Sequence, residues 1–182
     1  RGVRVDVGTD LAAMRAFYDL QVQTRQRHGV PVQPWRYFGM LWDDLIAVGL
    51  GFVLLAYQDD QCIAGGVYLH WQQTLVAKYA ASREDSLNLR PNDLLFWTAI
   101  RWGCEHGCQL LDFGRTEYGD QGLRQFKCRW GAEERDLVYS NVGQPASMSE
   151  DGRLHELMHA VIRRSPPWVC RAAGQLFYGH FE

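Results

Sequence analysis

Three consecutive β-rich segments, separated by very short polar turns, most constrain how this chain folds. They are FVLLAYQ at 52–58, CIAGGVYLHW at 62–71 and TLVAKYAA at 74–81. Only DDQ separates the first two segments, and only Gln72 and Gln73 separate the second from the third. Connections this short join antiparallel neighbours in a sheet. The middle of the chain is therefore predicted to form an antiparallel meander.

Most of the segment before the meander shows the hydrophobic spacing of helices. After a short strand over 3–7, apolar residues recur at helical spacing from Leu11 to Val22. Thr9 or Asp10 is the expected N-cap, and Gly29 provides a left-handed stop. A second helix is expected to start at Pro34, whose fixed φ suits a first turn.

The segment after the meander alternates between helix and strand patterns. A polar loop over 82–91 leads to a helix that Asn92 or Asp93 caps and that ends near His106. CQLLDF at 108–113 is short and apolar, which predicts a buried, central strand. A helix from Asp120 or Gln121 to about Trp130 and a strand over 135–142 follow.

The predicted order is β-α-α-β-β-β-α-β-α-β, followed by two tail helices. The tail helices are expected from Gly152 to Arg164 and, after the Pro166–Pro167 break, to about Gly179. A meander followed by β-α-β crossovers indicates an α/β fold with a mixed sheet. We expect residues 1–150 to form this domain and residues 151–182 to be a helical tail of the same domain.

Composition and charge restrict the function. The chain has 182 residues and a net charge of −2, whereas a dedicated nucleic-acid binder is usually clearly basic. No apolar run approaches the length of a membrane-spanning helix. Five cysteines without a disulfide framework suit a reducing cytoplasm, so a cytoplasmic location is expected. The chain starts with Arg1 rather than Met, which suggests that an upstream domain is missing.

The segment LDFGRTEYGDQGLRQFKCRWGAEE at 111–134 gathers charged residues, glycines and aromatics. A carboxylate at Asp112 inside a buried strand needs a cationic partner, and Arg115, Lys127 and Arg129 are the nearby choices. Arg115 follows the carboxyl end of the strand, where open α/β sheets bind their ligands. Lys127 follows an apolar Phe126, so its side chain is expected to point away from the core.

The element order and several motifs resemble the GNAT acyltransferase fold, and in particular the C-terminal half of FemAB-like proteins. The matching stretches include YAAS at 79–82, RPNDLLFWTAIRWGCEHG at 90–107 and the run from Asp112 to Gly131. FemAB-like proteins include the aminoacyltransferases of peptidoglycan interpeptide bridges. The nearest resemblance is to members associated with exopolysaccharide and PEP-CTERM systems. Proteins of the family are usually built from two tandem GNAT-like domains.

The resemblance implies an N-acyl- or aminoacyltransferase that forms an amide on a peptidoglycan or exopolysaccharide precursor at the inner face of the membrane. Lys127 matches the lysine of the family's Phe-Lys motif, which implies that it stabilises the oxyanion. Tyr79 matches a Tyr-x-x-Ser pattern of the substrate cleft. The other expected substrate-binding residues are Arg25, Arg90, Asn92, Asp112 and Arg115.

The acyl donor is left open between acyl-CoA and aminoacyl-tRNA, and no tightly bound cofactor is expected. GNAT enzymes bind the CoA pyrophosphate with a glycine-rich loop before a helix, whereas SREDSLNLRPND at 82–93 has no glycine. This departure weakens the CoA alternative and makes tRNA one of the partners to test.

Two further functions compete with acyl transfer. HELMH at 155–159 matches a zinc-hydrolase motif in which His155 and His159 bind the metal and Glu156 activates water. An amphipathic tail helix without a metal is the favoured interpretation of this segment. A degenerate GNAT domain that only binds a partner is the other alternative. The aromatic tail after Pro167 is expected to pack on protein or to rest on a membrane surface.

Overall fold

A five-stranded mixed sheet forms the centre of the protein. The computed structural model describes residues 2–140 and 152–178, without the side chains of 152–157. Strands β1 to β4 are antiparallel neighbours in sequence order, and β5 pairs in parallel with β4. The strands are β1 (Val3–Gly8), β2 (Gly51–Gln58), β3 (Gln61–Trp71), β4 (Thr74–Ser82) and β5 (Leu110–Asp112).

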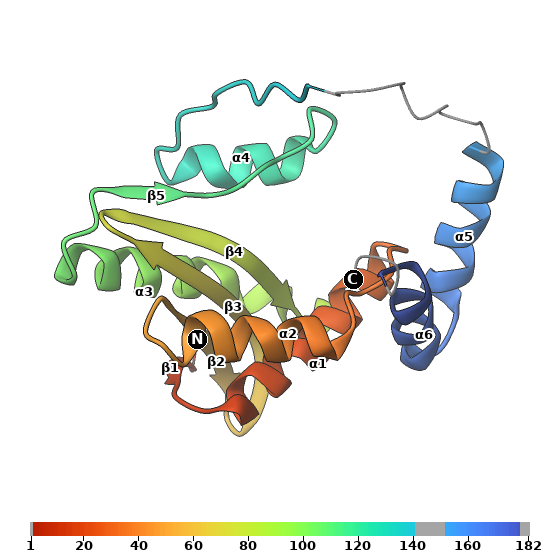
Figure 1. Cartoon of the computed structure of the whole chain (residues 1–182), viewed down its shortest axis with the longest axis horizontal. Coiled ribbons are helices and arrows are strands. Elements are labelled where there is room, and N and C mark those ends of the chain that lie inside the picture. The colour runs from red at the N-terminus through yellow and green to blue at the C-terminus, as the bar shows by residue number, and fades with distance from the viewer. Residues whose placement is uncertain (1, 141–151, 179–182) are drawn as a thin grey trace.

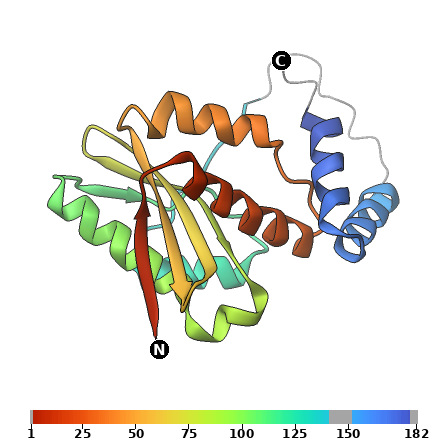
Figure 2. The ribbon, with the colours of Figure 1, turned by 90° about the horizontal axis from the view of Figure 1, so that it is seen from below.

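Helices cover both faces of this sheet (Figures 1 and 2). The described helices are α1 (Leu11–Arg27), α2 (Trp35–Leu41), η1 (Trp42–Ile46), η2 (Glu84–Leu89), α3 (Pro91–Glu105), α4 (Gln121–Arg129), α5 (Gly152–Arg164) and α6 (Pro167–Tyr178). Helices α1 and α2 lie on one face and α3 lies on the other, while α5 and α6 stand beside α1 at one end of the molecule.

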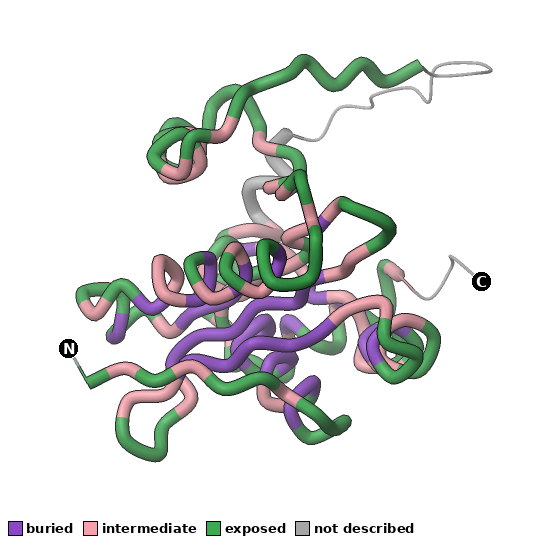
Figure 3. Tube along the Cα trace, turned by 90° about the vertical axis from the view of Figure 1, so that its left-hand side faces the viewer, coloured by how far each residue is buried: buried purple, intermediate pink, exposed green. Residues whose placement is uncertain are grey.

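The alternation of side chains along β2 builds two cores. Val53 and Leu55 pack with α1 and α2, whereas Phe52, Leu54 and Ala56 pack with α3. All five residues are buried because helices cover both faces of the strand. Figure 3 shows the buried residues concentrated in the central strands, while the chain from β5 to residue 140 is largely exposed.

The predicted element order is confirmed through α4, and the two tail helices are present. Asp10 is the N-cap of α1, since its carboxylate accepts the N–H of Ala13 at 2.9 Å. Gly29 follows α1 with a φ of 72°, as the sequence predicted. Helix α5 has the predicted bounds, and α6 starts at Pro167.

Four local predictions are wrong. β5 is an edge strand rather than a central one, and Leu110 is 59% exposed. Residues 135–140 form no strand, and the rest of that predicted strand lies outside the described residues. The expected loop after β4 contains the 3₁₀ helix η2. Helix α3 starts at Pro91 with Arg90 as its left-handed N-cap residue, so neither Asn92 nor Asp93 caps it.

Candidate functional site

The sheet opens between β4 and β5. The two strands pair only from Thr74 opposite Leu110 to Val76 opposite Asp112, while β4 continues to Ser82. Gly114 takes a φ of 68°, which suits glycine and turns the chain away from β4. The edge of β4 beyond Val76 therefore lies next to the loop that follows β5.

A β-bulge lies on β4 just beyond this opening. Val67 of β3 is opposite Tyr79, and Tyr68 is opposite Ala77, so Lys78 is an extra residue on β4. A bulge takes one residue out of the hydrogen-bonded ladder and redirects its neighbours. The sequence carries no clear signal for this bulge.

Lys127 holds the loop that follows β5. Its Nζ donates to the carbonyl oxygen of Gly114 at 2.8 Å and to that of Arg115 at 3.3 Å. An ammonium has three N–H groups, so one remains for a ligand. Burial lowers the pKa of Lys127, and the nearby carboxylates of Asp112 and Asp120 oppose this shift. Lys127 is half-buried, and its side chain reaches the loop that follows β5.

An aromatic cluster positions α4 so that Lys127 reaches this loop. The ring of Phe96 on α3 stacks on Phe113 at 5.3 Å and meets Phe126 edge-on at 5.2 Å. Trp130 at the end of α4 lies 6.5 Å from the same ring. Because α3 belongs to the well-packed part of the protein, these contacts fix α4 against it.

Asp112 and Arg115 do not form the expected ion pair. The Asp112 carboxylate is exposed and accepts the backbone N–H of Gly114 at 2.7 Å. Arg115 is exposed and donates to the hydroxyl of Tyr139 at 3.2 Å. Within the described part of the chain, Asp112 has no ion-pair partner within 4 Å. The expectation of a paired, buried carboxylate is wrong because β5 is an edge strand.

Tyr79 lies on the face of the sheet that α1 and α2 cover. Its hydroxyl and that of Tyr37 are 3.0 Å apart, and its ring packs against Phe17 and Phe38. Burial raises the pKa of Tyr79, and the hydrogen bond with Tyr37 adds to this effect. The pairing with Tyr37 joins residues 42 positions apart, so spacing in the sequence gave no indication of it.

Arg25 lies near Tyr79 but is held by its own surroundings. Its Nε donates to the carbonyl of Pro31 at 3.1 Å, beyond the end of α1. Arg25 also lowers the pKa of Tyr79, though less than burial and Tyr37 raise it. The structure therefore brings Arg25 and Tyr79 together on one face and leaves Asp112, Arg115 and Lys127 around the end of β5.

Arg90 and Asn92 lie at the start of α3. The Asn92 side-chain amide donates to the hydroxyl of Ser82 at 3.4 Å, and its buried Oδ1 has no partner among the described residues. Arg90 lines an open pocket beside α3. Asn92 thus reaches the end of β4, where the N–H of Ser82 also donates to the hydroxyl of Thr24 on α1.

The connection from β4 to α3 does not fit the pyrophosphate of CoA well. It contains no glycine, and Pro91 at the first helical position has no N–H to donate. Asp93 places a carboxylate in the first turn, where a phosphate would otherwise benefit from the helix dipole. The guanidinium of Arg83, which could otherwise bind a phosphate, forms an ion pair with Asp85 at 2.6 Å.

The zinc alternative depends on side chains that the structure does not describe. The backbone of α5 places positions 155 and 159 one turn apart, but the side chains of His155 and Glu156 lie outside the described residues. Among the described side chains, no group of three or more His, Cys, Asp or Glu is arranged to hold a metal ion. Within the same residues, no helix is long and apolar enough to cross a membrane.

Comparison with protein-family models and with solved structures points to the same fold. The model of the acetyltransferase (GNAT) domain matches residues 1–127. The sequence has no significant match among curated proteins. An aminoglycoside acetyltransferase from an uncultured soil metagenomic sample, in complex with sisomicin, is 12% identical with a TM-score of 0.63, covering 79% of this chain and 97% of its own.

Two further solved structures have the same fold. The 6'-N-acetyltransferase AAC(6')-Ih of Acinetobacter baumannii is 15% identical with a TM-score of 0.61, covering 78% of this chain and all of its own. FemX is 18% identical with a TM-score of 0.66 over 72% of this chain. The chain spans half the length of FemX.

Proposed function

Because this chain belongs to the GNAT acetyltransferase family, we propose that it is an N-acyl- or aminoacyltransferase domain that modifies a cell-envelope precursor. The acceptor would be an amine on a peptidoglycan or exopolysaccharide precursor. FemX is among the proteins with the same fold, which supports the FemAB-like assignment. In this proposal residues 151–182 belong to the same domain, and an upstream domain completes the acceptor site at the inner face of the membrane.

The observation that carries the proposal is the placement of Lys127 beside the opening between β4 and β5. Its ammonium is held by two carbonyls of the loop that follows β5, and Gly114 in that loop neighbours Ala77 of β4. A cation that is fixed before the reaction starts stabilises developing negative charge without reorganisation.

The reaction joins the acceptor nitrogen to the acyl carbon. The amine attacks the carbonyl of an activated ester or thioester, and the carbonyl oxygen becomes an oxyanion in the tetrahedral intermediate. Collapse of this intermediate breaks the bond to the donor oxygen or sulfur, which takes the proton that the amine loses. Lys127 would donate its remaining N–H to the oxyanion, while backbone groups at the Lys78 bulge would help to orient the acyl group.

Tyr79 and Arg25 would contribute to substrate binding from the opposite side of β4. Burial raises the pKa of Tyr79, so its hydroxyl stays protonated at neutral pH. Tyr79 donates this proton to Tyr37, so its oxygen can accept a hydrogen bond from the substrate but does not serve as a base. Arg115 is exposed and would bind an anionic part of the substrate.

Donor identity is tested by thermal-shift measurements with acetyl-CoA, CoA and an aminoacyl-adenosine that mimics the end of aminoacyl-tRNA. We expect the aminoacyl mimic to stabilise the protein more than CoA, because the start of α3 lacks the groups that cradle a pyrophosphate. Stabilisation by CoA alone would instead make acyl-CoA the donor.

The role of Lys127 is tested with Lys127→Ala and Lys127→Gln, using the donor found above and the protein with its upstream domain. Glutamine retains N–H donors for the loop carbonyls but removes the charge. We expect both variants to lose about 10²–10³-fold in turnover. Arg129→Ala, an exposed cation on the same helix, is the matched control and should retain activity. Retained turnover in both Lys127 variants would contradict the assignment.

A further inference from the structure

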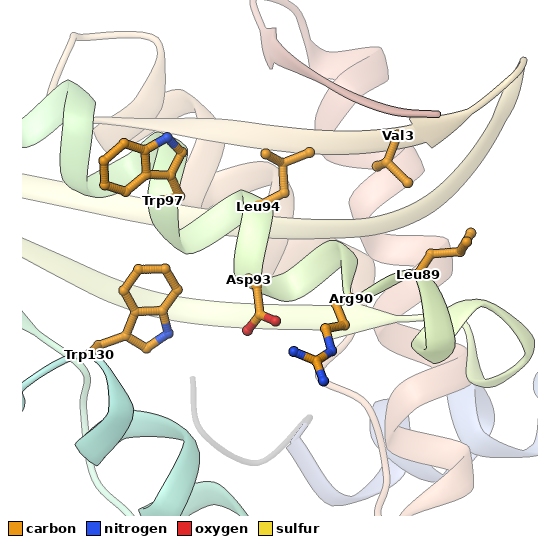
Figure 4. A pocket seen from close by; sticks show the side chains of 7 residues that line it. All are labelled: Val3, Leu89, Arg90, Asp93, Leu94, Trp97 and Trp130. Carbon is orange, nitrogen blue, oxygen red and sulfur yellow. The ribbon is translucent and has the colours of Figure 1, made fainter. Parts of the chain in front are cut away.

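A pocket of about 490 Å³ opens beside the first turns of α3. Its lining includes Arg90, Asp93, Leu94 and Trp97 from the start of α3, together with Trp130 from the end of α4. Figure 4 shows the indoles of Trp97 and Trp130 at one side of the pocket, separate from each other, with the Asp93 carboxylate and the Arg90 guanidinium beside them. The pocket thus combines two aromatic surfaces with one acidic and one basic group.

The helix period explains why these side chains face outward. Positions 93, 94 and 97 share one face of α3, whereas Leu95 and Ala99 on the opposite side are buried against the sheet. Trp97 is 54% exposed, which is costly for a side chain with so much apolar area. Trp130 is half-buried beside it. An exposed apolar surface of this kind is characteristic of a binding site.

The pocket is held by two elements of the fold. Trp97 lies on α3, which packs against the sheet, and Trp130 follows α4, whose position the Phe96 cluster fixes. A site whose walls are already in place loses less conformational freedom when a ligand binds. The two indoles therefore need little rearrangement to bind a ligand that lies against their faces.

The groups in this pocket fit a neutral saccharide. Indole faces pack against the apolar C–H faces of sugar rings, because both surfaces are removed from water together. A carboxylate accepts hydrogen bonds from two hydroxyls, and a guanidinium donates to several oxygens. The pocket is open to solvent, and it combines apolar walls with a few polar groups, as small-ligand sites do.

A phosphate group fits the same place poorly. Asp93 opposes an anion at the start of α3, and Pro91 lacks the N–H that a helix N-terminus would offer. One acidic and one basic side chain leave the pocket without net charge. The ligand class that matches is therefore uncharged and rich in hydroxyl groups.

We propose that the pocket formed by Arg90, Asp93, Trp97 and Trp130 is a binding subsite for a neutral saccharide. The subsite holds sugar rings against the two indoles and orients their hydroxyls with Asp93 and Arg90. This proposal concerns binding alone and does not depend on acyl transfer, so either proposal stands if the other fails.

Calorimetric titration of the whole chain with tri-N-acetylglucosamine and with maltotriose tests this proposal. We expect saturable binding of at least one oligosaccharide, weakened tenfold or more by Trp97→Ala and by Trp130→Ala. Asp93→Asn should weaken binding as well, because the amide accepts fewer hydroxyl hydrogen bonds. Trp71→Ala is the control, since Trp71 is 66% exposed at the end of β3 and does not line the pocket. Far-UV circular dichroism checks that each variant is folded.

A second measurement locates the ligand. The chain has seven tryptophans, and their indole N–H signals in ¹H–¹⁵N spectra are assigned with Trp97→Phe and Trp130→Phe. The signals of Trp97 and Trp130 should shift on titration, while that of Trp71 stays. The proposal is overturned if neither oligosaccharide binds at millimolar concentration, if the Trp→Ala variants bind as well as the parent, or if only CoA moves these signals.

Discussion

Lys127 is a half-buried cation whose surroundings make its charge sensitive to pH. Burial lowers its pKa below the ordinary value of 10.5. Oxyanion stabilisation needs the protonated form, so the rate should fall as the pH rises through this lowered pKa. At pH values below this pKa the ammonium keeps its charge.

Lys127→Arg tests this dependence, because a guanidinium stays protonated far above the pKa of a lysine. We expect the variant to retain part of the activity and to lose the alkaline fall in rate. The measurement is the pH profile of kcat/KM up to about pH 10.5, with Arg129→Lys as a control that should leave the profile unchanged. An identical alkaline fall in Lys127→Arg and the parent would assign that fall to another group.

At the scale of elements, α6 docks by close backbone approach. Gly174 on α6 lies against Val32, and a Cβ atom at this position would overlap the Val32 carbonyl oxygen. Cys170 is buried on the same helix, and Arg171 pairs with Asp19 of α1 at 2.7 Å. The glycine is needed here for space rather than for backbone conformation.

Gly174→Ala should therefore destabilise the protein by about 1–3 kcal/mol, because backbone atoms must move to admit a methyl group. The matched control is Gly39→Ala in α2, where a Cβ atom meets no other atom within 4 Å. That substitution should be neutral or stabilising, since alanine favours a helix. Urea unfolding measures both changes, and equal effects of the two substitutions would contradict this account of the docking.

At the scale of the whole molecule, the tail helices complete the core on the α1 side. Ile162 of α5 and Cys170 of α6 are buried together with Phe17 and Val22 of α1. The side chain of Gln26 also donates to the carbonyl of Ser165, between the two tail helices. The tail thus contacts α1 through apolar burial, an ion pair and a side-chain hydrogen bond.

Ending the chain at residue 150 should lower the free energy of unfolding by at least about 2 kcal/mol, because apolar surface on α1 loses its cover. A chain that ends at residue 178 keeps both helices and is the control. Urea unfolding followed by circular dichroism measures the difference. Equal stability of the two chains would mean that the tail is a separate unit.

The order of elements was readable from the sequence because it depends on local patterns. The change from helical to strand period around residue 51, the short turns of the meander, the Asp10 cap and the stop at Gly29 all act within a few residues. The prediction of Lys127 as the key residue also came from a motif, and its catalytic role stays a proposal.

The tertiary structure decided which strand edges and helix faces are covered. CQLLDF looks buried by composition, yet β5 pairs on one side only and Asp112 reaches solvent. The Tyr37–Tyr79 pair and the pocket that Trp97 and Trp130 both line bring together residues that are far apart in sequence. The bulge at Lys78 depends on strand register. The sequence by itself determined the elements and their order, because propensities and caps are local. Burial, register and the two candidate sites depend on which elements pack together, and only the folded chain determines that.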